Sequence, residues 1–272
     1  MPDSPGMTPS RIRDASDALH AVWREGRHTE ALPAEIRPGS RADGYAVQAL
    51  SEGWSALPLR GWKIAATSEA GQRHINVDGP LAGRMLAERV FSEGRPIALG
   101  RNRMRVAEVE FVFRMGRSLP PRDEPYGLDE VLDAVAALHL GIEVPDSRYL
   151  DFVSAGTPQL IADNACADQF VLGPEVPGDW RGIDLAGHAV QGRVEAGPGA
   201  GTVHDGRGAN VLGDPRIALA WIANELRRHG TTLGAGQIVT TGTCVAPIPI
   251  APGDVVKGDY GRLGALTVRF AA

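Results

Sequence analysis

Hydrophobic and polar residues alternate most regularly between Arg105 and Arg114. If this stretch is a strand, one of its faces is apolar at every second position, with Ala107, Val109, Phe111 and Phe113. Glu108 and Glu110 fall on the opposite face, beside Val106 and Val112. The pattern therefore predicts a strand that is anchored in a core by one face and presents two carboxylates on the other.

Apolar residues at helical spacing predict several helices. The expected ranges are 11–24, 41–51, 128–140 and 215 towards 229. Thr8 and Ser40 are candidate N-caps for the first two helices, and Asp214 is the candidate N-cap of the last, with Pro215 at its first position. Gly141 is expected to end the 128–140 helix, which would place Glu143 at an element boundary.

Short strands and many turns make up the rest of the expected fold. The strands are predicted at 61–67, 169–172, 187–195, 237–241 and 266–270. Residues 78–83 are expected to form a loop, 197–201 a loose hairpin turn and 252–254 a turn. The 34 glycines and 20 prolines are spread between apolar segments, which favours an α+β fold.

Composition indicates a globular protein that acts on a small molecule. The chain has 272 residues, 43% of them hydrophobic, and a net charge of −5, so it can bury a large core and offers no broad basic surface for nucleic acid or an anionic membrane. Residues 1–10 lack the pattern of a secretory signal, and no apolar run is long enough to cross a bilayer. We therefore expect a cytoplasmic location, with Cys166 and Cys244 as buried free thiols.

The tripeptide Glu108-Val109-Glu110 is the strongest candidate for chemistry. Two residues apart on a strand, its carboxylates project to one side and can ligate one cation together. With a third acid, such an all-oxygen site suits Mg²⁺ or Mn²⁺ and leaves positions for a chelating substrate. The alternative is the solvated face of an antiparallel strand, although Val106 and Val112 suggest that the acidic face is covered.

Lys63 is the second candidate, because it lies within the otherwise apolar stretch Trp62–Ala66. Partial desolvation is expected to lower its pKa towards a range useful for proton transfer. The alternative is a lysine on an edge strand whose ammonium reaches water. Asp146 and Arg148 could position Glu143 or bind a substrate carboxylate, or could simply form a turn.

Other catalytic motifs find no support in the sequence. His74, His139, His188 and His204 do not fall at metal-ligand spacing and are interpreted as structural. The chain has no G-x-S-x-G elbow, no P-loop and no G-x-G-x-x-G after a strand, so hydrolase-triad, nucleotide and dinucleotide sites are not indicated.

Four segments in series resemble the 2-keto-4-pentenoate hydratase and 4-oxalocrotonate decarboxylase branch of the fumarylacetoacetate hydrolase superfamily. They are Gly61-Trp62-Lys63-Ile64-Ala65-Ala66-Thr67-Ser68, Ala107-Glu108-Val109-Glu110, Gly141-Ile142-Glu143-Val144-Pro145-Asp146-Ser147-Arg148 and Ala162-Asp163-Asn164. The closing Pro252-Gly253-Asp254 turn and the segment 264–270 fit as well. The order and spacing match over nearly the whole chain.

The resemblance implies a mixed β-roll core with flanking helices, in one domain over 1–272 whose segment 1–60 is mainly helical. It implies a Mg²⁺ or Mn²⁺ site with Glu108, Glu110 and Glu143 as ligands and Lys63 as the active-site lysine. Substrate contacts are expected from Asp146, Arg148, Thr241 and Thr243. It further implies a homo-oligomer, with association with a related pathway enzyme as an additional option.

The implied activity is hydration of a 2-hydroxy-2,4-dienoate (2-oxo-4-enoate) to a 4-hydroxy-2-oxo acid by way of a metal-bound dienolate. The alternatives are a decarboxylase of a 2-oxo-dioate of the 4-oxalocrotonate type and a non-catalytic partner subunit. A hydrolase of acylpyruvates ranks third, since no His and Glu pair is evident.

Two departures from the branch bear on this choice. Ala65-Ala66 stands where Gly-Leu is usual, and Leu81 stands where an acid usually follows the proline matched by Pro80. If that acid manages protons during water addition, its loss favours the decarboxylase, although Asp78 is near enough in sequence to substitute.

Overall fold

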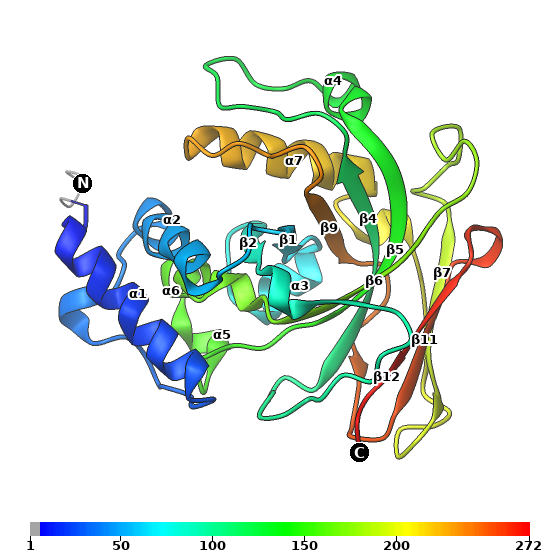
Figure 1. Cartoon of the computed structure of the whole chain (residues 1–272), viewed down its shortest axis with the longest axis horizontal. Coiled ribbons are helices and arrows are strands. Elements are labelled where there is room, and N and C mark those ends of the chain that lie inside the picture. Colours follow the sequence, from blue (N-terminus) through cyan, green and yellow to red (C-terminus); the bar gives the residue numbers. More distant parts are fainter. Residues whose placement is uncertain (1–5) are drawn as a thin grey trace.

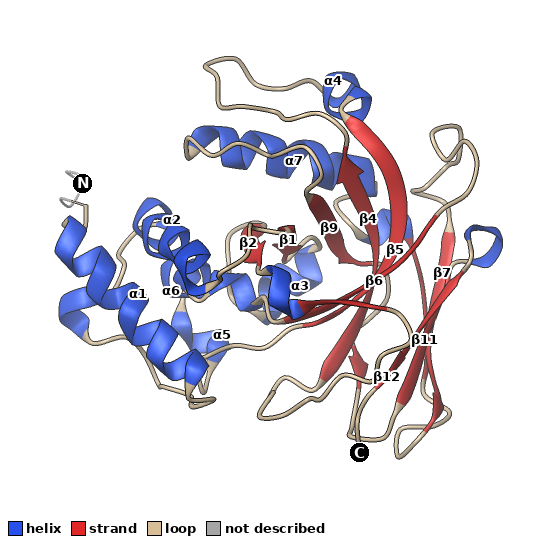
Figure 2. Cartoon of the chain, in the orientation of Figure 1, coloured by secondary structure: helices blue, strands red, loops and turns tan. Residues whose placement is uncertain are grey.

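The computed structural model describes residues 6–272 and builds the chain around two β-sheets (Figure 2). Within that range the larger sheet has the order β2-β1-β9-β4-β5-β6-β3, with β10 paired to β4. Its strands are β1 (Gly61–Ala65), β2 (Leu81–Met85), β3 (Val90–Ser92), β4 (Val106–Met115), β5 (Val135–Val144), β6 (Gln169–Glu175), β9 (Ile238–Thr243) and β10 (Ile248–Pro249). The sheet is mixed, because β1–β9 and β3–β6 pair in parallel and the other pairs are antiparallel.

The smaller sheet covers one face of the larger one (Figure 1). Its order is β12-β11-β7-β8, from β7 (Ala189–Ala196), β8 (Val203–Arg207), β11 (Val255–Asp259) and β12 (Ala265–Arg269). The ring of Phe111 on β4 meets the ring of Tyr260 edge-on, with centroids 5.4 Å apart. Burial of such a side chain stabilises the fold by about 1.5–3 kcal/mol. The apolar face of β4 is therefore the anchored one, as the alternation predicted.

The helices flank the sheets, and several gather beyond β1 and β2, on the side away from the smaller sheet (Figure 1). They are α1 (Pro9–Arg24), α2 (Arg41–Ala49), α3 (Glu69–His74), α4 (Leu128–Asp133), α5 (Phe152–Ala155), α6 (Thr157–Ala162) and α7 (Pro215–Arg228). The Gln48 amide of α2 donates to the carbonyls of Ala82 (2.8 Å) and Ile161 (2.9 Å). This one side chain ties α2 to both β2 and α6. In the described part of the chain, no helix has the length and apolarity to span a membrane.

The prediction of a helix over 128–140 is wrong beyond Asp133, because α4 ends there and the strand β5 begins at Val135. Both faces of β5 are covered, so its sequence is a nearly continuous apolar run whose period cannot separate a helix from a buried strand. Gly141 does not end a helix but lies within β5, opposite Glu110. Glu143 accordingly lies inside a strand instead of at an element boundary.

Other local expectations had mixed outcomes. Residues 78–83 are not all loop, since β2 begins at Leu81, and β8 and β11 were not predicted. The α1 and α7 helices are confirmed, with Thr8 and Asp214 as their caps. The 197–201 turn is confirmed as the link between β7 and β8. The expected mixed sheet with flanking helices is confirmed.

Gly61 offers a test of the β1–β9 junction. A Cβ at this position would lie 2.0 Å from the carbonyl oxygen of Ile238, a backbone atom that cannot move aside. We expect Gly61→Ala to lower the free energy of unfolding by at least ~1–3 kcal/mol through overpacking. Gly53→Ala is the matched control, because nothing lies within 4 Å of its Cβ position. Denaturant unfolding of both variants measures the effect, and equal midpoints would contradict the packing described here.

Candidate metal centre

Glu108, Glu110 and Glu143 converge on one point of the larger sheet. Glu108 on β4 lies directly opposite Glu143 on β5, and Glu110 is two residues along the same face of β4. One carboxylate oxygen from each of the three lies within 4.8 Å of the others. Glu110 and Glu143 are buried and Glu108 is half-buried, which excludes the solvated-face alternative.

The hydrogen bonding of this cluster is incomplete within the described residues. Oε2 of Glu110 accepts from the backbone N–H of Gly242 at 2.8 Å and from the hydroxyl of Thr240. Oε1 of Glu110 and Oε2 of Glu143 are buried without any hydrogen-bond partner. Buried carboxylate oxygens without donors are costly, and three carboxylates around one point are the donor set that a hard divalent cation requires. The residues present therefore fit Mg²⁺ or Mn²⁺.

Burial disfavours the ionised form of all three acids, and repulsion between glutamates adds to this effect at Glu108 and Glu110. Burial is the largest cause of the raised pKa of Glu108, about 7, and repulsion from Glu143 adds to it. The pKa of Glu110 is raised well above its ordinary value by burial and by both other glutamates. Burial also raises the pKa of Glu143, against the attraction of Lys63. A bound cation would reverse this balance by favouring the carboxylates.

Lys63 lies on β1, which is flanked by β2 and β9 and is not an edge strand. Its ammonium is buried and lies 3.1 Å from a carboxylate oxygen of Glu143. The edge-strand alternative is therefore excluded. Burial alone would lower the pKa of Lys63, but attraction by Glu143 and Glu108 outweighs it and raises that pKa above the ordinary value. The expectation of a lowered pKa was wrong in direction, because it considered desolvation without the neighbouring carboxylates.

The backbone around Lys63 supplies a contact that sequence reasoning missed. The ammonium donates to the carbonyl of Ala165 at 3.0 Å. Ala165 lies in a turn whose three residues, Asn164, Ala165 and Cys166, all have positive φ, at 58°, 51° and 61°. Asn164 belongs to a motif noted in the sequence, yet only its tolerance of left-handed backbone hinted at such a turn.

The predicted threonines occupy the end of β9, but the contacts to Glu110 come from their neighbours. The Thr241 hydroxyl donates to the Phe111 carbonyl at 3.0 Å, and the Thr243 hydroxyl to the Val245 carbonyl at 2.7 Å. Thr243 is paired with Glu110 in register. The roles of Thr241 and Thr243 in substrate binding stay predictions, whereas Thr240 and Gly242 were not anticipated.

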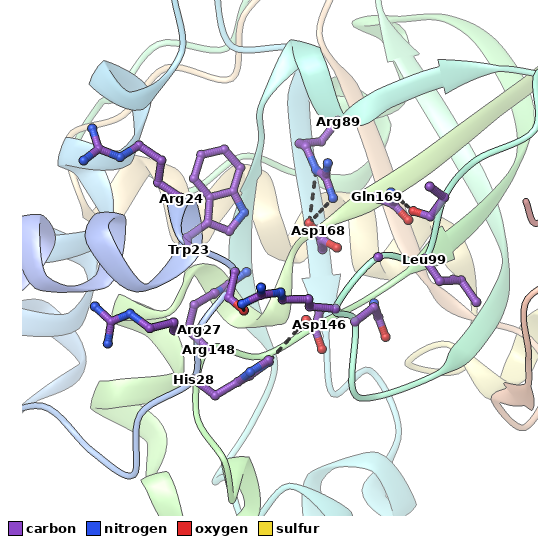
Figure 3. Close-up of a pocket in the computed structure, with 15 residues that line it drawn as sticks. Trp23, Arg24, Arg27, His28, Arg89, Leu99, Asp146, Arg148, Asp168 and Gln169 are labelled. Atoms are coloured by element: carbon purple, nitrogen blue, oxygen red, sulfur yellow. Dashed lines mark hydrogen bonds and ion pairs between the residues drawn. The ribbon is translucent and has the colours of Figure 1, made fainter.

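Asp146 and Arg148 line a separate pocket of about 410 Å³ (Figure 3), and none of the three glutamates is among the residues that line it. Arg148 donates to the side chain and carbonyl of the buried Asp163 and to the Ala167 carbonyl. Asp146 accepts from the backbone N–H of Arg103 at 2.9 Å. Their expected role with substrate stays a prediction, and in this structure they organise the turn after β5.

Leu81, which stands where the family usually has an acid, lies in the core of the structure. Its side chain is fully buried at the start of β2. Asp78, the candidate substitute, has a side chain that is 75% exposed and pairs with Arg41 at 3.0 Å. Asp78 therefore shows no contact with the glutamate cluster. Neither Leu81 nor Asp78 places an acid where it could manage protons during water addition.

Comparison with known proteins agrees with this geometry. The family described as "Fumarylacetoacetate (FAA) hydrolase C-terminal" matches residues 76–271. The "2-keto-4-pentenoate hydratase 1" of Dechloromonas aromatica (strain RCB) is 31% identical over 264 residues, covering 94% of this chain and 96% of that protein. The "2-keto-4-pentenoate hydratase" of Paraburkholderia xenovorans (strain LB400) is 29% identical, covering 97% and 96%.

A solved structure supports the fold independently. The 4-oxalocrotonate decarboxylase from Pseudomonas putida G7, complexed with magnesium and adipate, superposes with a TM-score of 0.86 at 24% identity. The match covers 98% of this chain and 100% of that one. With the family match and the full-length relatives, these findings show that this chain is an enzyme that belongs to the fumarylacetoacetate hydrolase family.

Proposed function

We propose that the chain is a divalent-metal-dependent lyase that hydrates a 2-hydroxy-2,4-dienoate (2-oxo-4-enoate) to a 4-hydroxy-2-oxo acid. The observation that carries the proposal is the pair of buried, unbonded carboxylate oxygens on Glu110 and Glu143 beside Glu108. The relatives named 2-keto-4-pentenoate hydratase support the choice of reaction. Mg²⁺ or Mn²⁺ would be held by the three glutamates.

A cation bound by the glutamates would polarise the 2-oxo group of the substrate and offset the negative charge that develops during proton transfer. The residues of the chain would do the rest. Lys63, protonated beside Glu143, would pass a proton from Nζ to the substrate carbon skeleton and recover one from the 2-hydroxyl group as the 2-oxo group forms. Water would then add to the distal end of the conjugated system. Thr243, beside Glu110 in register, is our candidate for a substrate contact, with Thr241 supporting the end of β9.

A decarboxylase of a 2-oxo-dioate is the second candidate, and Leu81 is the observation that favours it. Cleavage of a carbon–carbon bond needs no activated water, so a buried leucine in place of an acid would not impair it. A non-catalytic partner subunit fits less well, because Glu108, Glu110, Glu143 and Lys63 are all present and assembled.

Assembly and location are further parts of the proposal. We infer a homo-oligomer, as the family resemblance implies. The same proposal includes association with a related pathway enzyme. A cytoplasmic location suits the two buried free thiols, Cys166 and Cys244.

Removal of one ligand charge tests the metal site. We expect Glu108→Gln to weaken Mg²⁺ or Mn²⁺ binding at least about tenfold, since a hard cation loses an anionic ligand, and to lower turnover in parallel. Calorimetric titration of the metal and a kinetic assay measure the two effects. Glu195→Gln, an exposed change on the smaller sheet, is the control. An unchanged metal affinity for Glu108→Gln would refute the ligand assignment.

The pH dependence of stability tests the same cluster without turnover. Because the folded-state pKa of Glu108 is raised to about 7, the folded protein binds more protons than the unfolded chain between the ordinary glutamate pKa and 7. The metal-free protein should therefore lose stability as the pH rises through 7. Thermal unfolding between pH 5.5 and 8 measures this loss. Saturating Mg²⁺ should abolish it, and Glu108→Gln should reduce it; a metal-free protein that is equally stable at both ends contradicts the electrostatic account.

Product analysis separates the two lyase reactions. With Mg²⁺ present, we expect the protein to convert a 2-hydroxy-2,4-dienoate to the hydrated acid without releasing CO₂. Release of CO₂ from a 2-oxo-dioate, with no hydration, would instead establish the decarboxylase. Lys63→Met should lose activity in either case while still binding the metal, because the lysine is not a ligand. If neither substrate reacts, the partner-subunit alternative takes precedence.

A further inference from the structure

The turn Asn164–Cys166 combines an unfavourable backbone with a specific clamp. Three consecutive residues other than glycine lie in the left-handed region, at φ 58°, 51° and 61°, which L-amino acids rarely adopt in succession. Residues in such conformations persist only where the surroundings fix them, and they gather at functional sites. The turn is buried throughout, and Asn164 is only 6% exposed.

The side chain of Asn164 fixes this turn to β2. Its Oδ1 accepts the backbone N–H of Arg84 at 2.6 Å, and its Nδ2 donates to the carbonyl of Arg84 at 2.7 Å. The amide group thereby satisfies both backbone groups of one β2 residue, as a neighbouring strand would. The opposite edge of β2 pairs with β1, the strand that carries Lys63.

Gly83 makes room for this arrangement. It lies opposite Lys63 in the β1–β2 register. A Cβ on Gly83 would lie 2.5 Å from the carbonyl oxygen of Asn164 and 3.0 Å from Cγ of Lys63. Only a residue without a side chain lets the turn and the lysine stem meet across β2. The turn also reaches the segment that follows Glu143, since the Cys166 carbonyl accepts the backbone N–H of Asp146 at 3.0 Å.

These contacts fix the direction of the Ala165 carbonyl. With Asn164 clamped, the Ala165 carbonyl points at the ammonium of Lys63, 3.0 Å away. Within the described residues, the ammonium also contacts Glu143 at 3.1 Å, whose carboxylate is a proposed metal ligand. The Ala165 carbonyl is therefore the contact of Lys63 that does not share its oxygen with the metal site.

We propose that Asn164 is a positioning residue for the reaction, which clamps the left-handed turn so that the Ala165 carbonyl fixes the ammonium of Lys63. This inference rests on the proposed role of Lys63 in proton transfer. Asn164 acts through the lysine and has no contact of its own with the reacting atoms in this account. A small shift of the ammonium would lengthen the distance over which the proton is transferred, and it would leave the three glutamate side chains in place.

A double-mutant cycle tests the proposal. Asn164→Gly keeps the left-handed backbone accessible and removes the clamp, so we expect kcat to fall about tenfold to a hundredfold, with KM and calorimetric Mg²⁺ affinity within about twofold. In the Lys63→Met background, the same change should cost almost nothing further, because a residue that acts through the lysine has nothing left to position. Asn76→Gly is the matched control, since Asn76 also has positive φ (54°) but is exposed.

Each outcome decides a separate point. If Lys63→Met lowers kcat but Asn164→Gly does not, the positioning role is wrong and the proposed function stands. If the two losses multiply in the double variant, Asn164 acts by another route and the proposal is overturned. If Lys63→Met leaves kcat unchanged, the proposed role of Lys63 fails and the positioning role fails with it. Should Asn164→Gly not fold, Asn164→Asp, which retains the acceptor for the Arg84 N–H, takes its place in the same cycle.

Discussion

Three carboxylates around a single ammonium, two of them buried and one half-buried, are the constraint on which this structure depends. The ion pair between Lys63 and Glu143, at 3.1 Å, offsets part of the negative charge of the three carboxylates. In the part of the chain that the structure describes, Glu108 and Glu110 have no further cationic side chain beside them in the cluster, since Lys63 is the only cation among the causes that act on their pKa values. Desolvated charge without a counter-ion destabilises a fold. A bound divalent cation would compensate this negative charge. The same uncompensated charge that destabilises the metal-free protein therefore gives the site its affinity for a metal.

The rest of the sheet makes this cluster tolerable by anchoring its strands from the other side. Val109, Phe111 and Phe113 are fully buried on the opposite face of β4. Pairing of Glu108 with Glu143 depends on the antiparallel register of β4 and β5. A slip of one residue would turn the phenylalanines towards the metal site and the glutamates into the core. The apolar face therefore specifies the geometry of the ligands as well as the stability of the strand.

The sequence predicted the parts of this centre that depend on local pattern. Alternation along β4 was sufficient to place Glu108 and Glu110 on one face. The apolar context of Lys63 indicated partial desolvation but left a lysine on an edge strand as the alternative. The sequence pattern misassigned β5, because a strand covered on both faces carries no period of two, and so the position of Glu143 came only from family resemblance. The direction of the Lys63 pKa shift depends on Glu143 and Glu108, which are distant in sequence. The contacts of Thr240 and Gly242 with Glu110 depend on how β9 pairs with β4, which no local pattern encodes.

Lys63 has two kinds of partner, a carboxylate on the strand β5 and a backbone carbonyl on a turn. An ammonium held only by Glu143 would share its partner oxygens with a metal ion, and its position would then depend on whether the ion is bound. The Ala165 carbonyl is a neutral acceptor on a turn that Asn164 joins to β2, and its distance from the lysine does not rest on the charge of the cluster. Backbone in the left-handed region is the local cost of presenting that carbonyl from outside the sheet. Electrostatics thus selects the ion, while the turn keeps the proton-carrying group in place beside it.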